Sequence, residues 1–111
     1  MSDHFGLPRS AFLILLALSD GPGHGLGIIT RVENATSGSV ELGPGTLYGT
    51  IQILAADGLI RECEAPTPDQ ADRRRRFFKL TPRGDRALRA EAARLRILVE
   101  AAATRRLMDQ V

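Results

Sequence analysis

The fold is decided by the stretch GPGTLYGTIQILAADGLI at residues 43–60, followed by RRRRFFKLTPRG at residues 73–84. In the first stretch, Pro44 suits the first position of a helix, where its missing N–H would have no partner. The apolar residues that recur at helical spacing on one face are Leu47, Ile51 and Leu54. Gly58 is typical of a residue that ends a helix. The stretch therefore predicts a helix with one buried face.

The opposite face of this helix is small, polar and uncharged. Its residues are Thr46, Tyr48, Gly49, Thr50 and Gln52. A helix that only has to stay soluble more commonly carries Glu and Lys there. Small hydroxyl and amide side chains let a helix approach the floor of a DNA major groove and meet base edges. On this stretch alone, a groove-reading helix and a weakly amphipathic structural helix both remain open.

The second stretch predicts a β-hairpin that leads into a long helix. Residues 59–64 and 76–80 alternate in polarity as strands do, and residues 65–72 form a proline-containing loop between them. A strong helix start follows, with a cap, a first-turn proline and a first-turn acid at Thr81, Pro82 and Asp85. This last helix is predicted to run from Pro82 to about Gln110.

The first 42 residues predict two helices and a minimal strand. Helices are expected over about residues 8–19 and 24–37, separated by the turn signal DGPGHG at residues 20–25. Residues 40–42 alternate briefly and are predicted as a short strand. The fold class is therefore mostly α with a small β-hairpin: a winged helix-turn-helix domain over residues 1–81 and a C-terminal dimerisation helix over residues 82–111.

The last helix carries an apolar stripe that a small domain cannot cover. The stripe consists of Leu88, Ala92, Leu95, Leu98, Val99 and Ala102. Its near-heptad spacing favours packing against a second copy of the same helix, which predicts a homodimer. The alternative is that the stripe folds back on the first helix of its own chain.

Four consecutive arginines, Arg73, Arg74, Arg75 and Arg76, are the strongest charge feature. Charge runs are usually solvated hairpin tips. Adjacent arginines repel one another unless anions are nearby, however, and this run follows the helix with the polar face. Backbone phosphates of double-stranded DNA supply such anions. The DNA-contact residues predicted from the sequence are therefore these arginines and the polar face of the helix.

Length and composition restrict the other possibilities. The 111 residues suffice for one compact domain, and the net charge is only +2. The charge is uneven, because residues 1–60 hold two arginines against five acidic residues, whereas residues 61–111 hold 13 basic against eight acidic residues. The single cysteine, Cys63, excludes an internal disulfide and a cysteine-based metal cluster, and we expect it to be buried or on an edge strand.

No enzyme, cofactor or metal site is expected. The glycine-rich run GPGHGLG at residues 21–27 does not match G-x-G-x-x-G in any offset and does not follow a strand. His24 has no second histidine or cysteine near it in the sequence. The longest apolar run, Ala11 to Leu18, is about half of the ~20 residues that a membrane span needs. Because the chain also lacks a basic cluster before that run, a cytoplasmic protein is expected.

In its motifs the chain resembles the PadR family of transcriptional regulators. The residues that carry the resemblance lie in HGLGI at 24–28, PGTLYGTIQILAADGLI at 44–60 and RRFFKLTPRGDRAL at 75–88. The family pattern has a His-Gly-Tyr motif, a Pro-Gly-Thr-Leu-Tyr start to the recognition helix with Gly-Leu-Ile at its end, and a wing strand running into Leu-Thr-Pro-x-Gly. With one terminal helix, the chain resembles the shorter subgroup of the family.

The chain departs from the family pattern at several positions. Leu26 replaces the tyrosine of the His-Gly-Tyr motif, and Gly27 stands where a helix-forming polar residue is usual. Phe77 and Phe78 stand where the family commonly has tyrosine, which keeps the apolar bulk of the wing and removes hydroxyls. The sequence contains no tryptophan, so a drug-binding centre built on stacked tryptophans is not carried over.

The resemblance implies a homodimeric repressor that binds a roughly palindromic operator and responds to a small-molecule effector of unknown identity. The effector is expected in a cavity between the terminal helices and the first helix. A winged-helix module that binds proteins instead of DNA is the main alternative. A small enzyme is the third hypothesis, and it would need a cofactor or a titratable cluster that the sequence does not present.

Overall fold

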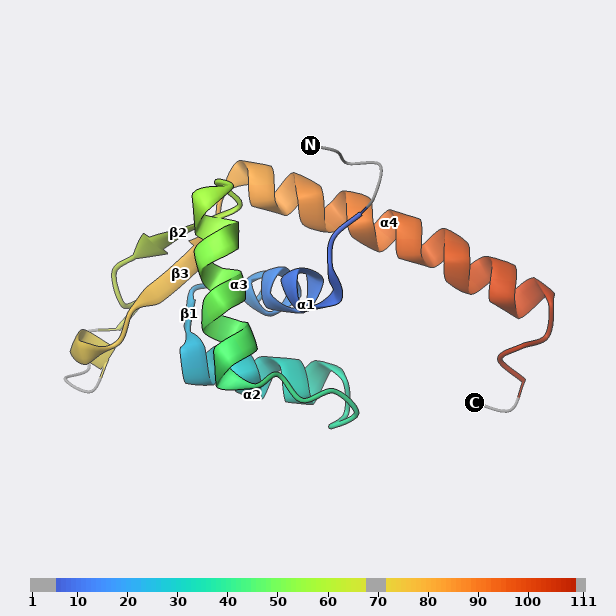
Figure 1. The fold of residues 1–111 in the computed structure, drawn as a ribbon, viewed down its shortest axis with the longest axis horizontal. Coiled ribbons are helices and arrows are strands. Elements are labelled where there is room, and N and C mark those ends of the chain that lie inside the picture. Colours follow the sequence, from blue (N-terminus) through green and yellow to red (C-terminus); the bar gives the residue numbers. More distant parts are fainter. Residues whose placement is uncertain (1–5, 68–71, 110–111) are drawn as a thin grey trace.

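The computed structural model describes residues 6–67 and 72–109, which form four helices and a small sheet. The elements are α1 (Arg9–Leu18), β1 (Gly23–His24), α2 (Gly25–Ala35), α3 (Pro44–Ala56), β2 (Ile60–Cys63), the 3-10 turn η2 (Asp72–Arg74), β3 (Phe77–Leu80) and α4 (Pro82–Thr104). Figure 1 shows α1 in the middle, with α2 below it, α4 above it and α3 crossing beside it, while β2 and β3 project to one side as the wing. The predicted winged-helix fold class, mostly α with a small β-sheet, is confirmed.

The core surrounds α1, as its apolar composition predicts. The largest side chains with almost no exposed surface are Ile14, Leu15, Ile28, Val32, Leu47 and Ile60. They come from α1, α2, α3 and β2, so the core joins the wing to the helices. Among the helices of the described residues, none has both the length and the apolar character needed to cross a membrane.

The sheet differs from the predicted two-stranded hairpin. It has three antiparallel strands in the order β1-β3-β2. Residues 23–24, predicted as a turn, pair with β3 through Gly23 opposite Phe78 and His24 opposite Phe77. The strand predicted at residues 40–42 is wrong: that segment is irregular, although Leu42 is buried. Because β1 and β2 pair with the two edges of β3, residues 40–42 cannot pair with β3.

The last helix ends earlier than predicted, at Thr104 instead of near Gln110, which itself lies outside the described residues. Arg106 adopts a left-handed backbone with φ 61°. The amides of Arg106 and Leu107 donate to the carbonyls of Ala103 and Ala102 at 2.9 and 3.0 Å. This is the hydrogen-bond pattern of a Schellman helix end. This helix end could not be predicted from the residues, because an arginine occupies the position usually taken by glycine.

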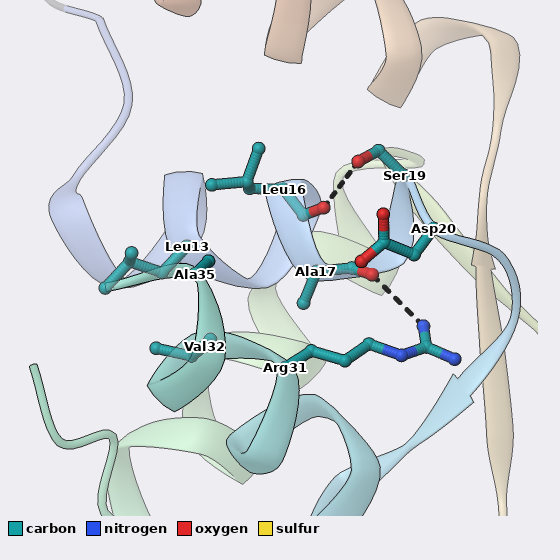
Figure 2. A pocket seen from close by; sticks show the side chains of 8 residues that line it. All are labelled: Leu13, Leu16, Ala17, Ser19, Asp20, Arg31, Val32 and Ala35. Carbon is teal, nitrogen blue, oxygen red and sulfur yellow. Dashed lines mark hydrogen bonds between the residues drawn. The ribbon is translucent and has the colours of Figure 1, made fainter. Parts of the chain in front are cut away.

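Arg31 of α2 fixes the end of α1. Its guanidinium donates to the carbonyl of Ala17 at 3.1 Å, of Gly21 at 2.7 Å and of Pro22 at 2.9 Å. Figure 2 shows this side chain reaching across to Ala17, beside a cavity of about 140 Å³ between α1 and α2. Carbonyls at the end of a helix lack intrahelical partners. The arginine therefore bonds one carbonyl in the last turn of α1 and two in the turn that follows, and it joins α2 to α1.

The start of α4 is held tightly against the turn between α3 and β2. Thr81 caps α4 by accepting from the amide of Gly84 at 3.0 Å, and its hydroxyl donates to the carbonyl of Gly58 at 2.6 Å. Its own amide donates to the carbonyl of Leu59 at 3.1 Å. A Cβ atom on Gly84 would overlap the Leu59 carbonyl oxygen and lie 2.8 Å from its carbon. Only glycine allows this approach.

Farther along, α4 is fastened to the segment before α1. Glu91 is buried at 4% exposure and accepts from the amide of Leu7 at 3.1 Å and from Nε of Arg94 at 3.0 Å. The hydrogen bonds from Arg94, and secondarily the one from Leu7, lower the pKa of Glu91 despite its burial, which acts in the opposite direction. The same contact raises the pKa of Arg94.

Replacing Gly84 with alanine is expected to lower the free energy of unfolding by about 2 kcal/mol, because the added methyl group collides with backbone atoms that cannot rotate away. Gly49→Ala is the matched control, since nothing lies within 4 Å of a Cβ at that helical position. It should raise stability by up to about 1 kcal/mol. Urea denaturation measures both, and equal midpoints for the two variants would refute the close-approach argument.

Glu91→Gln is expected to lower stability by about 1 kcal/mol at neutral pH, a modest value because Arg94 is partly exposed. A carboxylate with a lowered pKa stabilises the fold fully above its unfolded pKa of about 4.3, and that contribution is lost as the pH falls through the folded value. The gap between wild type and variant should therefore narrow below about pH 4. Glu100→Gln, at an exposed ion pair with Arg96, should change little at either pH. A gap that stays constant with pH would contradict the assignment.

Candidate nucleic-acid interface

The helix predicted to read DNA, α3, forms as the sequence indicates. Gly43 is extended, Pro44 occupies the first turn, and the amide of Leu47 donates to the Gly43 carbonyl at 2.9 Å. The predicted buried face is confirmed, since its buried residues are Leu47, Ile51 and Leu54. Gly58, with φ 76°, ends the helix and turns the chain into β2. The polar face is thereby directed away from the core.

Most of the predicted contact residues on α3 lie at the surface. Thr46, Tyr48, Gly49 and Gln52 are exposed. Thr50 is half-buried on the side of the helix that faces α1, and its hydroxyl donates to Oγ of Ser10 at 3.3 Å. The structure therefore separates Thr50 from the other four residues.

Ile53 also lies on this face, with 62% of its surface exposed. The sequence analysis did not single it out. The spacing of the buried residues of α3 places Ile53 on the exposed face of the helix. An isoleucine at an exposed position was the signal that could have identified it. An exposed aliphatic side chain there could contact a thymine methyl group.

His24 joins α2 to the wing. Its Nδ1 accepts from the amide of Gly27 at 3.2 Å, which caps α2, and its ring meets Phe77 edge-on at 5.1 Å. Nη1 of Arg75 lies 2.9 Å from its Nε2. His24 therefore connects α2, β3 and the arginine segment of the wing, residues 73–76. Among the described residues, no group of three or more His, Cys, Asp or Glu side chains could hold a metal ion.

Tyr48 of α3 lies directly over the start of α2. A Cβ on Gly25 would overlap its hydroxyl group and lie 2.9 Å from the ring carbon that bears it. Tyr48 nevertheless keeps 54% of its surface exposed. Because Gly25 has no side chain, it leaves room for Tyr48 on the exposed face of α3.

The arginines of the wing are exposed but not equivalent. Nη2 of Arg76 pairs with Oε1 of Glu62 at 2.9 Å, and its guanidinium carbon lies 5.3 Å from the centre of the Phe78 ring. That hydrogen bond lowers the pKa of Glu62 and raises the pKa of Arg76. Arg73 and Arg74 are exposed in η2 and form no ion pair with another described residue. They carry the charge most readily offered to an anion.

The apolar stripe of α4 falls into two parts. Leu88 is buried in the core of its own chain, and Leu95 is half-buried beyond it. Farther out, Leu98 and Val99 are 53% and 50% exposed on the same side of the helix. Ala92 is exposed and Ala102 half-buried. Figure 1 shows this second half of α4 extending well past α1, so the rest of the described chain leaves the outer part of the stripe uncovered.

Comparisons with known proteins agree with this architecture. Residues 14–90 match the family model described as "Transcriptional regulator PadR-like family". The chain is 41% identical over 80 residues to an uncharacterized 37.1 kDa protein in transposon TN4556 of Streptomyces fradiae, a match that covers 72% of this chain and 21% of that protein. The chain thus spans about a fifth of the length of this curated relative.

Solved structures share the fold. A PadR family transcription regulator from Clostridium difficile R20291 matches with a TM-score of 0.74 and 21% identity, covering 87% of this chain and 97% of that chain. BpsR of Bordetella bronchiseptica, whose DNA binding is regulated by 6-hydroxynicotinic acid, matches with a TM-score of 0.66 and 22% identity, over 88% of this chain and 66% of that chain.

Proposed function

The chain belongs to the PadR-like family of transcriptional regulators, and from this premise we propose that it binds operator DNA as a homodimer and represses transcription. The family consists of transcriptional regulators and not of enzymes. The fold, four helices with a small three-stranded sheet, supports a DNA-binding regulator. We also propose which residues read the operator, that the protein is a dimer, and that it responds to a ligand.

The observation that carries the proposal is the pairing of two surfaces. The outer face of α3 has no charged side chain and includes an open glycine, Gly49. Next to it, η2 presents Arg73 and Arg74 without ion-pair partners among the described residues. A smooth, polar helix fits into a major groove, and flexible cations at its side fit the phosphates that border the groove.

Within this interface we assign different tasks to the two surfaces. Gln52 can bond an adenine edge through its amide, and Ile53 can meet a thymine methyl group. Tyr48 and Thr46 can donate hydroxyls to bases or phosphates. Arg73 and Arg74 bind phosphates and so fix the orientation of the wing without reading sequence. Arg76 is paired with Glu62, and Thr50 faces α1. We therefore assign neither residue a main DNA contact.

The exposed outer half of the α4 stripe supports a homodimer. Leu98 and Val99 lie beyond the core of their own chain, on the same side of α4 as Leu88. A second copy of α4 would cover them and relate the two chains by a two-fold axis. Two α3 helices would then enter successive major grooves about 34 Å apart, which requires a roughly palindromic operator. Repression follows if the operator overlaps the promoter, and an effector would act by lowering DNA affinity.

Replacing both Arg73 and Arg74 with alanine is expected to weaken binding to operator and random duplexes alike. The slope of log affinity against log salt should flatten by about one for each lost phosphate contact. Gln52→Ala should cost about 1–3 kcal/mol on the operator and little on random DNA. Arg96→Ala, which removes one arginine charge far along α4, is the control for the loss of positive charge outside the interface. Fluorescence anisotropy with the upstream DNA of the gene, titrated at several salt concentrations, measures all four proteins.

If the arginine and glutamine variants affect operator and random DNA in the same way, this division of tasks is wrong. Wild-type protein without salt-dependent affinity for any duplex would instead favour a winged-helix module that binds proteins.

Val99→Glu is expected to convert the dimer to a monomer at micromolar concentration, because two carboxylates would be buried across the two-fold axis. Ile97→Glu is the matched control: Ile97 is 66% exposed and lies on the opposite side of α4. Sedimentation equilibrium measures the mass. A dimer that survives Val99→Glu, or dissociates equally with both variants, would place the interface elsewhere.

A further inference from the structure

His24 contacts two different partners through its two ring nitrogens. Its Nδ1 accepts from the amide of Gly27 at 3.2 Å, and its Nε2 lies 2.9 Å from Nη1 of Arg75. Other atoms hold the ring in place. It meets Phe77 edge-on at 5.1 Å and lies over the first turn of α2, where a Cβ on Gly27 would be 3.4 Å from Cε1 and Nε2. Both contacts are therefore made by one ring in one orientation.

No protonation state of an imidazole at neutral pH satisfies both contacts. A neutral histidine carries a hydrogen on one nitrogen and a lone pair on the other, whereas a guanidinium and a backbone amide only donate. If Nδ1 accepts from Gly27, the hydrogen lies on Nε2 and faces an N–H of Arg75. If Nε2 accepts from Arg75, the hydrogen lies on Nδ1 and faces the N–H of Gly27. An imidazolium donates from both nitrogens, so it fails at both contacts.

The contact with Arg75 is the stronger of the two. Hydrogen bonds from a charged donor are about twice as strong as those between neutral groups, and this contact is also the shorter. In the protein without DNA, Nε2 is therefore expected to accept from Arg75, with the hydrogen on Nδ1. The amide of Gly27 then loses its cap at the start of α2. Moving Arg75 away from Nε2 would restore that cap.

A phosphodiester group would resolve this conflict between donors. Its two charged oxygens accept and do not donate, so one phosphate can take an N–H from Arg75 and another from Nε2 of His24. With the hydrogen on Nε2, Nδ1 can again accept from Gly27 and cap α2. His24 and Arg75 line one cavity together with Tyr48 and Gln52 of α3. Because these neighbours belong to the candidate DNA interface, a backbone phosphate of DNA is favoured over a carboxylate of a protein partner.

We propose that His24 is a DNA contact that becomes available when Arg75 leaves it for the same backbone phosphate. The proposal rests on the proposed function, because the phosphate belongs to the bound duplex. On binding, one proton leaves Nδ1 to water and another arrives at Nε2 from water, so the charge of the ring is unchanged. Nε2–H then donates to the phosphate, while Nδ1 accepts from Gly27. His24 thereby connects phosphate binding at the wing with the capping of α2.

Nitrogen-15 NMR of the imidazole tests the contact with Arg75 without DNA, because it shows which nitrogen carries the hydrogen. His4, which lies outside the described residues, is replaced with glutamine, so that His24 is the single imidazole of the 111-residue chain. At about pH 8 an ordinary imidazole is neutral. The hydrogen should lie on Nδ1 in this protein and on Nε2 after Arg75→Ala. The control Arg73→Ala, which removes the same charge two residues earlier in η2, should leave it on Nδ1.

Three results of this measurement would overturn the proposal. They are a hydrogen on Nε2 before any DNA is added, hydrogens on both nitrogens, and a tautomer that Arg75→Ala does not change.

Addition of a duplex from the upstream DNA of the gene tests the contact with phosphate. In the complex the hydrogen should lie on Nε2, and the amide of Gly27 should exchange with solvent more slowly because α2 is capped. Sodium phosphate at the same concentration of phosphate groups should leave the hydrogen on Nδ1. A hydrogen on Nδ1 in the complex would overturn the contact. The same change with sodium phosphate alone would overturn the assignment to DNA and identify a site for the free ion.

Two variants of His24 separate phosphate binding from capping. His24→Asn keeps a good helix cap and removes Nε2–H, so it should weaken binding to operator and random duplexes about tenfold. His24→Gln gives up the cap but places an amide N–H near Nε2, and it should recover most of the affinity. Both variants exchange neutral groups, so the slope of log affinity against log salt should stay that of wild type, whereas Arg75→Ala should flatten it by about one.

Fluorescence anisotropy measures these affinities, and urea denaturation shows that each variant is folded. Unchanged affinity in His24→Asn would overturn the phosphate contact. Equal losses in His24→Asn and His24→Gln would assign the residue a structural role only. If wild type binds no duplex, the proposed function fails, while the comparison with Arg75→Ala still decides whether Arg75 sets the tautomer of His24.

Discussion

The architecture depends on one close approach of two backbones, where the first turn of α4 meets the turn after α3. Gly84 lies against the carbonyl of Leu59, and Thr81 bonds to Gly58 and Leu59 while capping α4. This contact sets where the wing strand ends relative to α3 and in which direction α4 leaves the domain. It gives a physical reason for the two motifs that the sequence analysis quoted, Gly-Leu-Ile and Leu-Thr-Pro-x-Gly, since each supplies one side of the same junction.

The candidate interface has buried elements at its base and exposed side chains at its rim. Leu47, Ile51 and Leu54 fix α3 in the core, and Phe77 and Phe78 bury the wing strand. Arg73 and Arg74 lie in the 3-10 turn η2, and Arg75 and Arg76 follow it, at the end of the wing away from the Gly84 junction. Such an arrangement suits sequence reading by the exposed face of a helix anchored in the core, and phosphate binding by long side chains, because only base readout needs an accurately placed backbone.

The sequence predicted the features that depend on local chemistry and missed those that depend on tertiary contact. Helical spacing identified the buried face of α3, and Thr81 and Pro82 identified the start of α4. The strand at Gly23 and His24 was missed because two residues carry no periodicity, and pairing with β3 alone makes them a strand. In the candidate interface, the helical pattern identified most of the polar residues of α3 that are exposed. The exposure of Ile53, the ion pair of Arg76 and the inward side of Thr50 depend on neighbours that are distant in sequence.

The same junction at Gly84 makes α4 the connection between the proposed dimer interface and the candidate DNA interface. Because α4 starts beside α3 and continues for 23 residues, its far end moves through a longer path than its start when the helix tilts. A change in how two α4 helices cross would therefore alter the separation of the two α3 helices, and an effector at the dimer interface would have to act through that geometry.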